Sequence, residues 1–323
     1  MSTGRPALGE MLADLVELGA IEFRPEPLDA LVERRLKAVW TARSCPNCGA
    51  ESLQALSNSS RIWCGRCDWK TTYTRGTPFY NSDLAPGEVL IAFVLYADSL
   101  LSINQIALLL SPCYKTLFER IKETETAFHR GFPTVWGHLP QTVKGPTQID
   151  ETQQQCSGYK GQEPPRNGLD RAGSSSEAGR TRWSGEWGDE LTLVAACRDS
   201  LRVVAAEEGV AYDEELGPVL EEVEDLSQSL GEVWTDEFPA YKAMDHDRRI
   251  VVHDEEYVTD DGVHTNQVEC LWSLIQPWLA KFRGLSKQGL EQAARTYGFV
   301  RSLNLTDAPL RNLVSCIAVN AFR

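Results

Sequence analysis

The sequence lacks the features of several common protein classes. It contains no run of about 18 or more apolar residues, so no membrane-spanning helix is expected. The N-terminal stretch MSTGRPALGEMLADL lacks the charged and then apolar pattern of a signal peptide, and we expect a cytoplasmic protein with no membrane partner. Lysine is scarce, with 9 residues against 23 arginines. The net charge of −14 argues, on its face, against nucleic-acid binding, because phosphate contact needs positive charge.

The charge is distributed unevenly along the 323 residues, a length that predicts two or three folding units. Residues 207–237 carry 12 acids and no base, whereas residues 281–301 carry five bases against one glutamate. A local basic surface on an acidic molecule is therefore compatible with the composition. An acidic excess with little lysine is also typical of proteins from a salty cytoplasm, since salt screens repulsion between like charges. The composition thus suggests a halophilic host such as a halophilic archaeon.

Four of the nine cysteines form two close pairs, CPNCG and CGRCD. Their C-x2-C-x15-C-x2-C spacing lets four thiolates converge tetrahedrally on one zinc ion. A closed shell of four protein ligands indicates a structural site rather than a catalytic one. A pair of redox dithiols is the alternative, but such chemistry more naturally uses one C-x-x-C at a helix start. The predicted zinc ligands are Cys45, Cys48, Cys64 and Cys67.

A helical region follows this predicted zinc ribbon. The apolar stretch 86–100 predicts a buried helix, SINQIALLL begins with Ser102 as an N-cap, and SPCYKTLFERIKETE begins with Ser111 and has Pro112 in its first turn. Two short helices joined by a tight turn are typical of a helix-turn-helix, although a bundle that only links domains has the same outline. The basic side chains predicted to contact DNA from the second helix are Lys115, Arg120 and Lys122.

From residue 147 onward the predicted order is strand, β-hairpin, helix, strand, helix, strand and helix, which indicates an α/β domain with a mixed sheet. The first strand carries the carboxylates Asp150 and Glu151, a later strand ends near Asp236, and Glu269 lies on the polar edge of an otherwise apolar helix. Phosphodiester chemistry with two divalent ions needs carboxylates of this kind, because hard oxygen ligands suit Mg²⁺. Taken singly, each residue has an ordinary explanation as a turn former or cap.

Together these residues carry a resemblance to the DDE insertion-sequence transposases, in the group that places a zinc ribbon before an RNase H-like catalytic domain. That group is marked by DE in the first catalytic strand, TD-x-x-x-AY after the next acidic strand and HTN-x-x-E at the start of the last catalytic helix. The matching stretches here are IDET, WTDEFPAY and HTNQVE, and the resemblance covers roughly residues 45–304. It implies that Asp150, Asp236 and Glu269 are catalytic ligands of Mg²⁺ or Mn²⁺, with Asn266 competing for the third place.

The resemblance also implies an architecture and a set of partners. The expected fold is an α/β RNase H-like catalytic domain, with a mixed sheet flanked by helices, preceded by a small zinc ribbon and a helix-turn-helix segment. The partners are the terminal inverted repeats of a transposon and target DNA, and a homo-oligomer is expected because two ends must be processed together. The expected divisions are a helical segment at 1–40, a zinc ribbon at 41–80, a helix-turn-helix-like region at 84–130, a catalytic domain at 145–305 with a flexible insertion near 157–188, and a tail at 306–323.

One position departs from the family pattern, which usually has a basic residue seven positions after the glutamate. Here Gln276 occupies that place, and Pro277 follows it and should kink or end the helix. Either the nearby bases Lys281 and Arg283 take over the phosphate contact, or this copy is impaired. Three functions therefore remain open: an active transposase, a non-catalytic DNA-binding regulator derived from one, and an RNase H-like nuclease. Retention of all three carboxylates favours the transposase.

Overall fold

The computed structural model divides into two compact units, and each is described by itself. Unit 1 comprises residues 1–140 and 303–323, and unit 2 comprises residues 141–302. The residues whose structure is described are 26–57, 59–139, 143–155, 190–208, 213–237, 241, 248–252, 257–282 and 285–319. Among the described helices, none combines the length and the hydropathy needed to cross a membrane. The flexible insertion expected near 157–188 and the first 25 residues lie outside the described part of the chain.

Unit 1 contains a small antiparallel sheet against which one helix packs. The elements are α2 (Glu26–Thr41), β1 (Leu53–Ala55), β2 (Arg61–Cys64) and β3 (Lys70–Thr72), with strand order β1-β2-β3. Burial alternates along β2, where Ile62 is fully buried and Arg61 is exposed, so the sheet has one dry face and one wet face. Trp40 of α2 packs against the dry side, and its indole nitrogen donates a 3.0 Å hydrogen bond to the carbonyl of Tyr73.

The helical part of unit 1 follows the sequence prediction closely at its start. Its helices are α3 (Pro86–Asp98), α4 (Ile103–Leu110), α5 (Tyr114–Trp136) and α10 (Pro309–Val319). Helix α3 is buried on nearly every side, as its apolar sequence predicts. Ser102 caps α4 as expected, because its hydroxyl accepts from the backbone N–H of Gln105 while the Gln105 side chain accepts from the backbone of Ser102.

The start of α5 corrects the sequence prediction. Ser111 is not the N-cap of this helix: its φ is 68°, and its N–H closes α4 on the carbonyl of Ala107 at 2.8 Å. Ser111 is the C-cap of α4 in the left-handed region, which is not the extended conformation of an N-cap residue. Helix α5 begins only at Tyr114, after Pro112. The tight turn expected between the two helices is nevertheless present.

The C-terminal segment, expected to be a tail, contains the buried helix α10 instead. Its apolar residues recur at helical spacing and include the buried Leu310, Leu313 and Ile317. Helix α10 packs closely on α5 at Gly131, where a Cβ atom would overlap the carbonyl group of Cys316. Unit 1 is therefore assembled from two segments that are far apart in the sequence.

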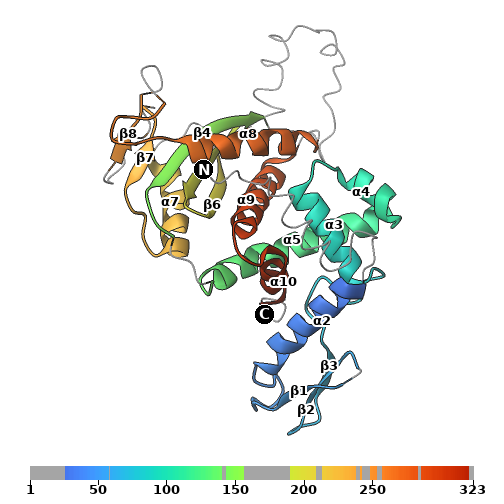
Figure 1. The fold of residues 1–323 in the computed structure, drawn as a ribbon. Helices are drawn as coiled ribbons and strands as arrows, with labels where there is room; N and C mark the ends of the chain where they lie inside the picture. The colour runs from blue at the N-terminus through green and yellow to red at the C-terminus, as the bar shows by residue number, and fades with distance from the viewer. Residues whose placement is uncertain are drawn as a thin grey trace. The chain divides into compact units, whose positions relative to one another are not determined.

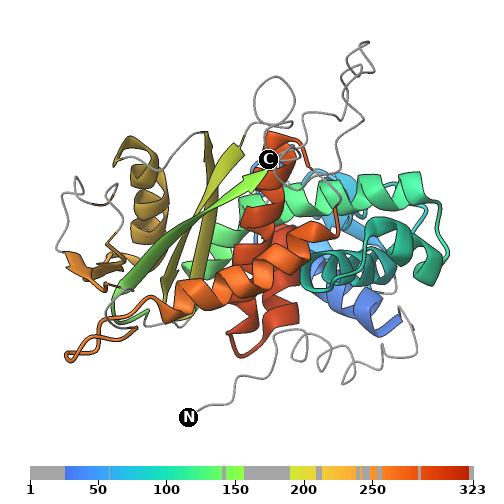
Figure 2. The same ribbon diagram turned by 90° about the horizontal axis from the view of Figure 1, so that it is seen from above.

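Unit 2 is built around a five-stranded mixed sheet, shown in Figures 1 and 2. Its strands are β4 (Thr147–Gln155), β5 (Glu190–Arg198), β6 (Leu201–Glu208), β7 (Val233–Thr235) and β8 (Arg248–Ile250). In space they run β6-β5-β4-β7-β8; β4, β5 and β6 pair antiparallel, and β7 and β8 run parallel to β4. Asp199, at φ 48°, begins the two-residue hairpin loop between β5 and β6. The predicted α/β class with a mixed sheet is confirmed.

Helices cover both faces of this sheet (Figure 2). They are α7 (Asp213–Ser227) on one face, and α8 (Asn266–Ala280) and α9 (Lys287–Asn304) on the other. The core under α8 and α9 includes Ala195, Trp278 and Tyr297. Pro277 does not end α8, because three more helical residues follow it. The helix expected between β7 and β8 falls mostly outside the described residues.

Candidate functional site

The strand order of unit 2 brings two of the predicted catalytic aspartates together. Asp150 lies in β4, and Asp236 directly follows β7, the parallel neighbour of β4. Gln148 pairs with Trp234 in the register of these two strands. Extending that register by two positions brings Asp150 level with Asp236.

Burial is the main influence on the carboxyl group of Asp150, and it raises the pKa to about 6. Repulsion from the carboxylates of Asp236 and, more weakly, Glu269 acts in the same direction. Two donors oppose this rise, because the backbone N–H of Glu151 and the indole N–H of Trp272 each lie 2.9 Å from a carboxyl oxygen of Asp150. The three predicted acidic residues are therefore close enough to influence one another.

The two candidates for the third ligand lie in different surroundings, and the charge of Glu269 is one of the causes that raise the pKa of Asp150. Glu269 lies in the first turn of α8, where the hydroxyl of the buried Thr265 donates a 2.6 Å hydrogen bond to its Oε1. Asn266 is exposed at the first position of the helix, and its backbone N–H points to Nδ1 of His264 at 3.4 Å. The choice between Glu269 and Asn266 stays a prediction.

Glu151 faces the opposite side of β4 from Asp150, since adjacent strand residues alternate between faces. Its carboxylate accepts a hydrogen bond from the hydroxyl of Tyr241, a residue that is almost fully buried. Burial raises the pKa of Glu151 to about 7. Burial and the neighbouring carboxylate also raise the pKa of Tyr241, which keeps the phenol protonated as a donor. The sequence marks Tyr241 only as part of a motif, whereas the structure identifies its partner.

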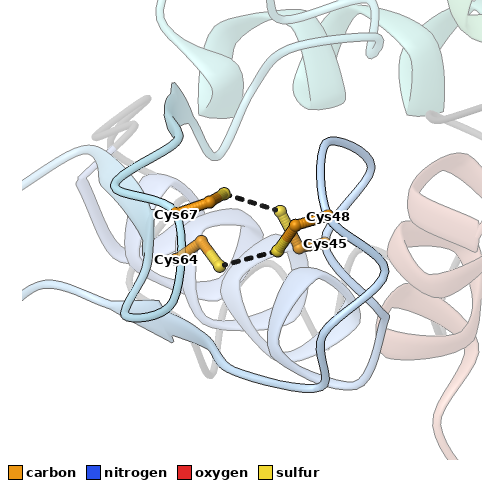
Figure 3. A group of neighbouring side chains, drawn as sticks. All are labelled: Cys45, Cys48, Cys64 and Cys67. Atoms are coloured by element: carbon orange, nitrogen blue, oxygen red, sulfur yellow. Dashed lines mark hydrogen bonds between the residues drawn. The ribbon is translucent and has the colours of Figure 1, made fainter.

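The predicted zinc ligands come together in unit 1, as Figure 3 shows. Two Sγ–Sγ distances across the cluster, from Cys45 to Cys67 and from Cys48 to Cys64, are each 3.7 Å. A tetrahedral zinc ion with Zn–S bonds near 2.3 Å separates its sulfurs by about 3.8 Å. The four Sγ atoms all lie within 4.8 Å of one another, and within the described part of the chain no other group of three or more His, Cys, Asp or Glu is gathered closely enough to hold a metal ion in this way.

Two tight turns aim the cysteines at one another. Each C-x-x-C pair is followed by a residue in the left-handed region, Gly49 at φ 69° and Asp68 at φ 59°. The strain at Asp68 is offset by its side chain, which accepts from Nε1 of Trp63 at 2.7 Å and from Nζ of Lys70 at 3.2 Å. The cluster thus rests on a locally stabilised scaffold.

Comparison with known proteins identifies the family. No family model matches the chain. A Halobacterium salinarum protein, described as an uncharacterized protein in transposable element ISH50, is 30% identical over 267 residues, which cover 80% of this chain and 85% of that protein. The chain belongs to the family of this ISH50 protein. The membership confirms the similarity to insertion-sequence transposases that the sequence motifs indicate.

A more distant likeness concerns a solved structure, described as a pre-cleavage Mos1 transpososome. It is 11% identical, with a TM-score of 0.22 and coverage of 72% of this chain and 78% of that chain. A TM-score this low does not establish a shared fold.

The predicted DNA-contacting bases of this ISH50-family chain lie in different surroundings. The side chain of Lys115 is 81% exposed at the start of α5. Lys122 is engaged within unit 1, because its Nζ lies 2.6 Å from the carboxylate of Glu125, which is 2% exposed. Arg120 donates to the carbonyl of Pro78 at 3.1 Å. Of these three bases, Lys115 has the most exposed side chain.

The bases near the end of α8 are only partly described. Nζ of Lys281 lies 4.2 Å from the ring centroid of Trp278 and 5.0 Å from that of Phe282, so the ammonium rests on aromatic faces. Arg283 lies outside the described residues. Gln276, which replaces the expected base of the family, is exposed, and its Nε2 lies 3.4 Å from Oγ1 of Thr152 on β4.

Sequence reasoning missed Gln148, which is 1% exposed and lies two residues before Asp150 on the same face of β4. Its Oε1 accepts from the backbone N–H of Gln267 at 2.8 Å, and its Nε2 lies 3.4 Å from Nδ1 of His264. It also missed Trp272, three residues after Glu269 on one face of α8. The alternation of polar residues in TQIDET and the helical spacing after HTN were the available signals.

Proposed function

We propose that this chain is the DNA transposase of an insertion element, which binds the ends of its element and catalyses metal-dependent cleavage and joining of DNA strands. One observation carries the proposal: Asp150 and Asp236 lie on neighbouring strands, and Glu269 acts on Asp150 from α8. Membership in the family of a protein from a transposable element supports it.

The sheet of unit 2 supports the RNase H-like assignment. It is mixed, helices lie on both of its faces, and the first acidic strand is central and adjacent to the strand that leads to Asp236. The ordered motifs IDET, WTDEFPAY and HTNQVE occur on these elements in the order that the resemblance requires. The combination favours a catalytic domain over a platform that only binds DNA.

Asp150, Asp236 and Glu269 would hold Mg²⁺ or Mn²⁺, because carboxylate oxygens are the hard ligands that these ions prefer. Three carboxylates from separate elements suit a pair of ions, which two-metal sites place about 3.5–4 Å apart. When bound, such ions activate the attacking oxygen and stabilise the leaving oxygen of a phosphodiester.

The chain's own residues hold the carboxylates in place. Trp272 engages one oxygen of Asp150, and Thr265 engages one oxygen of Glu269. In unit 1 the cysteine cluster would bind a structural zinc ion, and the turn between α4 and α5 presents the exposed Lys115 for contact with transposon DNA. A homo-oligomer is part of the proposal, because two element ends must be cut together.

The test is strand cleavage and joining on a labelled duplex that carries the element's own end, in high-salt buffer with Mg²⁺ or Mn²⁺. We expect the wild type to nick and join, and we expect Asp236→Asn to lose both activities while it still binds the duplex. Asp260→Asn is the matched control, because Asp260 is exposed and lies in the turn that precedes α8; it should retain full activity.

Three results would contradict the proposal in distinguishable ways. A wild type that binds the end tightly and never cuts it indicates the regulator. Nicking without joining indicates a nuclease of the same fold. Cleavage and joining that survive in Asp236→Asn would show that the Asp236 carboxylate is not needed for the reaction.

A further inference from the structure

Three successive residues on one face of β4 make hydrogen bonds to successive turns of α8. Gln148 accepts from the backbone N–H of Gln267 at 2.8 Å, and Asp150 accepts from the indole of Trp272 at 2.9 Å. The third contact joins Oγ1 of Thr152 to Nε2 of Gln276 at 3.4 Å. We call this set the β4–α8 ladder: Gln148, Asp150 and Thr152 on the strand, and Gln267, Trp272 and Gln276 on the helix.

The spacing of the two elements explains how all three contacts form at once. The four steps along β4 from Gln148 to Thr152 span about 13 Å at roughly 3.3 Å per residue. The nine steps along α8 from Gln267 to Gln276 span about 13.5 Å at 1.5 Å per residue. The two spans match, so all three hydrogen bonds can form in one alignment of α8 along β4. Glu269 lies between the first two helix positions of the ladder.

The rest of the packing between α8 and the sheet does not set this alignment sharply. The same buried stripe of α8 that includes Trp272 packs through apolar side chains such as Val268 and Ile275, which are fully buried. Apolar burial is non-directional, and it tolerates small axial shifts far better than hydrogen bonds do. A shift of one residue along the helix is about 1.5 Å, whereas a catalytic site must be held to about 0.5 Å.

We propose that the β4–α8 ladder sets the axial position of α8 on β4, and that Gln148 is its main positioning residue for the metal-binding pair Asp150 and Glu269. This inference rests on the proposed function and deepens it. Gln148 is the strongest contact of the ladder outside the carboxylates, because it is buried and uses both its oxygen and its nitrogen, the latter toward His264. A buried amide without these partners would be costly, so the contact resists sliding.

The ladder also assigns a role to Gln276. This residue stands where the family usually has a base, and its amide reaches the strand at the exposed end of the ladder. Gln276 is therefore a positioning residue rather than the remnant of a lost phosphate contact.

The experiment compares Gln148→Met with Gln267→Met in the full-length protein. Both replace a glutamine with a side chain of similar size, but Gln267 contributes only its backbone N–H to the ladder. Ion binding is followed by terbium luminescence, sensitised by the indole of Trp272 beside Asp150. The Asp150→Asn variant identifies the part of the signal that belongs to this site. Cleavage rates and DNA affinity are measured in parallel.

We expect Gln148→Met to raise the terbium concentration at half saturation by about tenfold or more, as removal of outer contacts does at other metal sites. It should also lower kcat without changing KM for the DNA end, whereas Gln267→Met should stay within about twofold of the wild type in each respect. If Gln148→Met does not fold, Thr152→Val and Thr152→Ser replace it. Valine removes the hydroxyl and should weaken ion binding, and serine retains it and should restore binding.

Two outcomes overturn the inference. A folded Gln148→Met, or Thr152→Val, that binds terbium and cuts DNA like the wild type shows that the ladder does not position the site, although the proposed function stands. A wild type that shows neither terbium binding dependent on Asp150 nor strand cleavage removes the proposed function and the ladder's role together.

Discussion

The indole Nε1 of Trp272 donates a hydrogen bond of 2.9 Å to Oδ2 of Asp150. This donor favours the ionised carboxyl group, yet burial and the neighbouring carboxylates outweigh it, and the pKa of Asp150 is raised from 3.8 to about 6. Ionised Asp150 therefore destabilises the metal-free fold, and a bound cation relieves the repulsion.

This balance predicts how stability depends on pH. Because the pKa of Asp150 is higher in the folded state than in the unfolded chain, its contribution to stability is full below about pH 4 and is lost as the pH rises through about 6. We expect metal-free Asp150→Asn to exceed the wild type in unfolding free energy at pH 8 by on the order of 2 kcal/mol, and to match it near pH 4. Urea unfolding with a chelator at constant salt measures the difference. An advantage that does not change with pH would contradict the prediction.

The contact between Tyr241 and Glu151 predicts a specific loss of stability. Tyr241→Phe removes the phenol donor of the half-buried Glu151 carboxyl group, and loss of such a donor typically costs about 1–3 kcal/mol. Tyr257→Phe is the control, because Tyr257 is 72% exposed and should change the unfolding free energy by less than about 0.5 kcal/mol. Denaturation midpoints of the two variants decide the matter, and equal midpoints would show that the Tyr241 hydroxyl contributes nothing.

Zinc removal should unfold the small sheet of unit 1. Its strands have only three or four residues each, so they bury too little apolar surface to be stable without the metal. Elemental analysis should find one zinc ion per chain, lost in Cys64→Ser and retained in Cys113→Ser, whose thiol is exposed and lies outside the cluster. After chelation, limited proteolysis should gain new cuts within residues 44–72, and the cutting pattern of unit 2 should stay as it is in the zinc-loaded protein. Unchanged resistance there would mean that the sheet does not need a metal.

Two lysines of α5 should respond in opposite ways to the same substitution. Lys115→Gln should weaken binding of the element end and lower the slope of log affinity against log salt by about 0.9, since one phosphate contact is lost. Lys122→Gln should instead lower the unfolding free energy by on the order of 2–3 kcal/mol, because it removes the cation of an ion pair with the buried Glu125. Salt-dependent binding assays and urea titrations separate the two effects. A stability loss in Lys115→Gln, or a change of salt slope in a folded Lys122→Gln, would reverse this assignment.

The elements with strong local chemistry were predictable from the sequence. The cysteine spacing predicted the cluster because four thiolates can converge only if the two turns face each other, and Ser102 predicted a helix start because its hydroxyl can reach Gln105. Ser111 has the same chemistry, but it ends α4 in the left-handed conformation and so does not cap α5, and the sequence pattern alone ranks the two serines equally. The mixed sheet followed from the order of apolar strands.

Other features depend on which surfaces meet, and local sequence does not encode that. Gln148 and Thr152 look like ordinary polar positions of a strand until their face is known to lie against α8. Tyr241 donates a hydrogen bond to Glu151, which lies 90 residues away in the sequence. The roles of Asp150, Asp236 and Glu269 in catalysis stay predictions.

The contact between Gly131 and Cys316 has a consequence for biosynthesis. Helix α5 emerges from the ribosome long before α10, and unit 2 is translated in full between them. Unit 1 must wait for the last helix before its core closes, whereas unit 2 can fold as soon as it is made. A copy of the gene with a stop codon before Pro309 would therefore yield a complete unit 2 with all three carboxylates and an unfinished unit 1. Such a product would retain the residues of the reaction and lose the part of the molecule proposed to find its DNA.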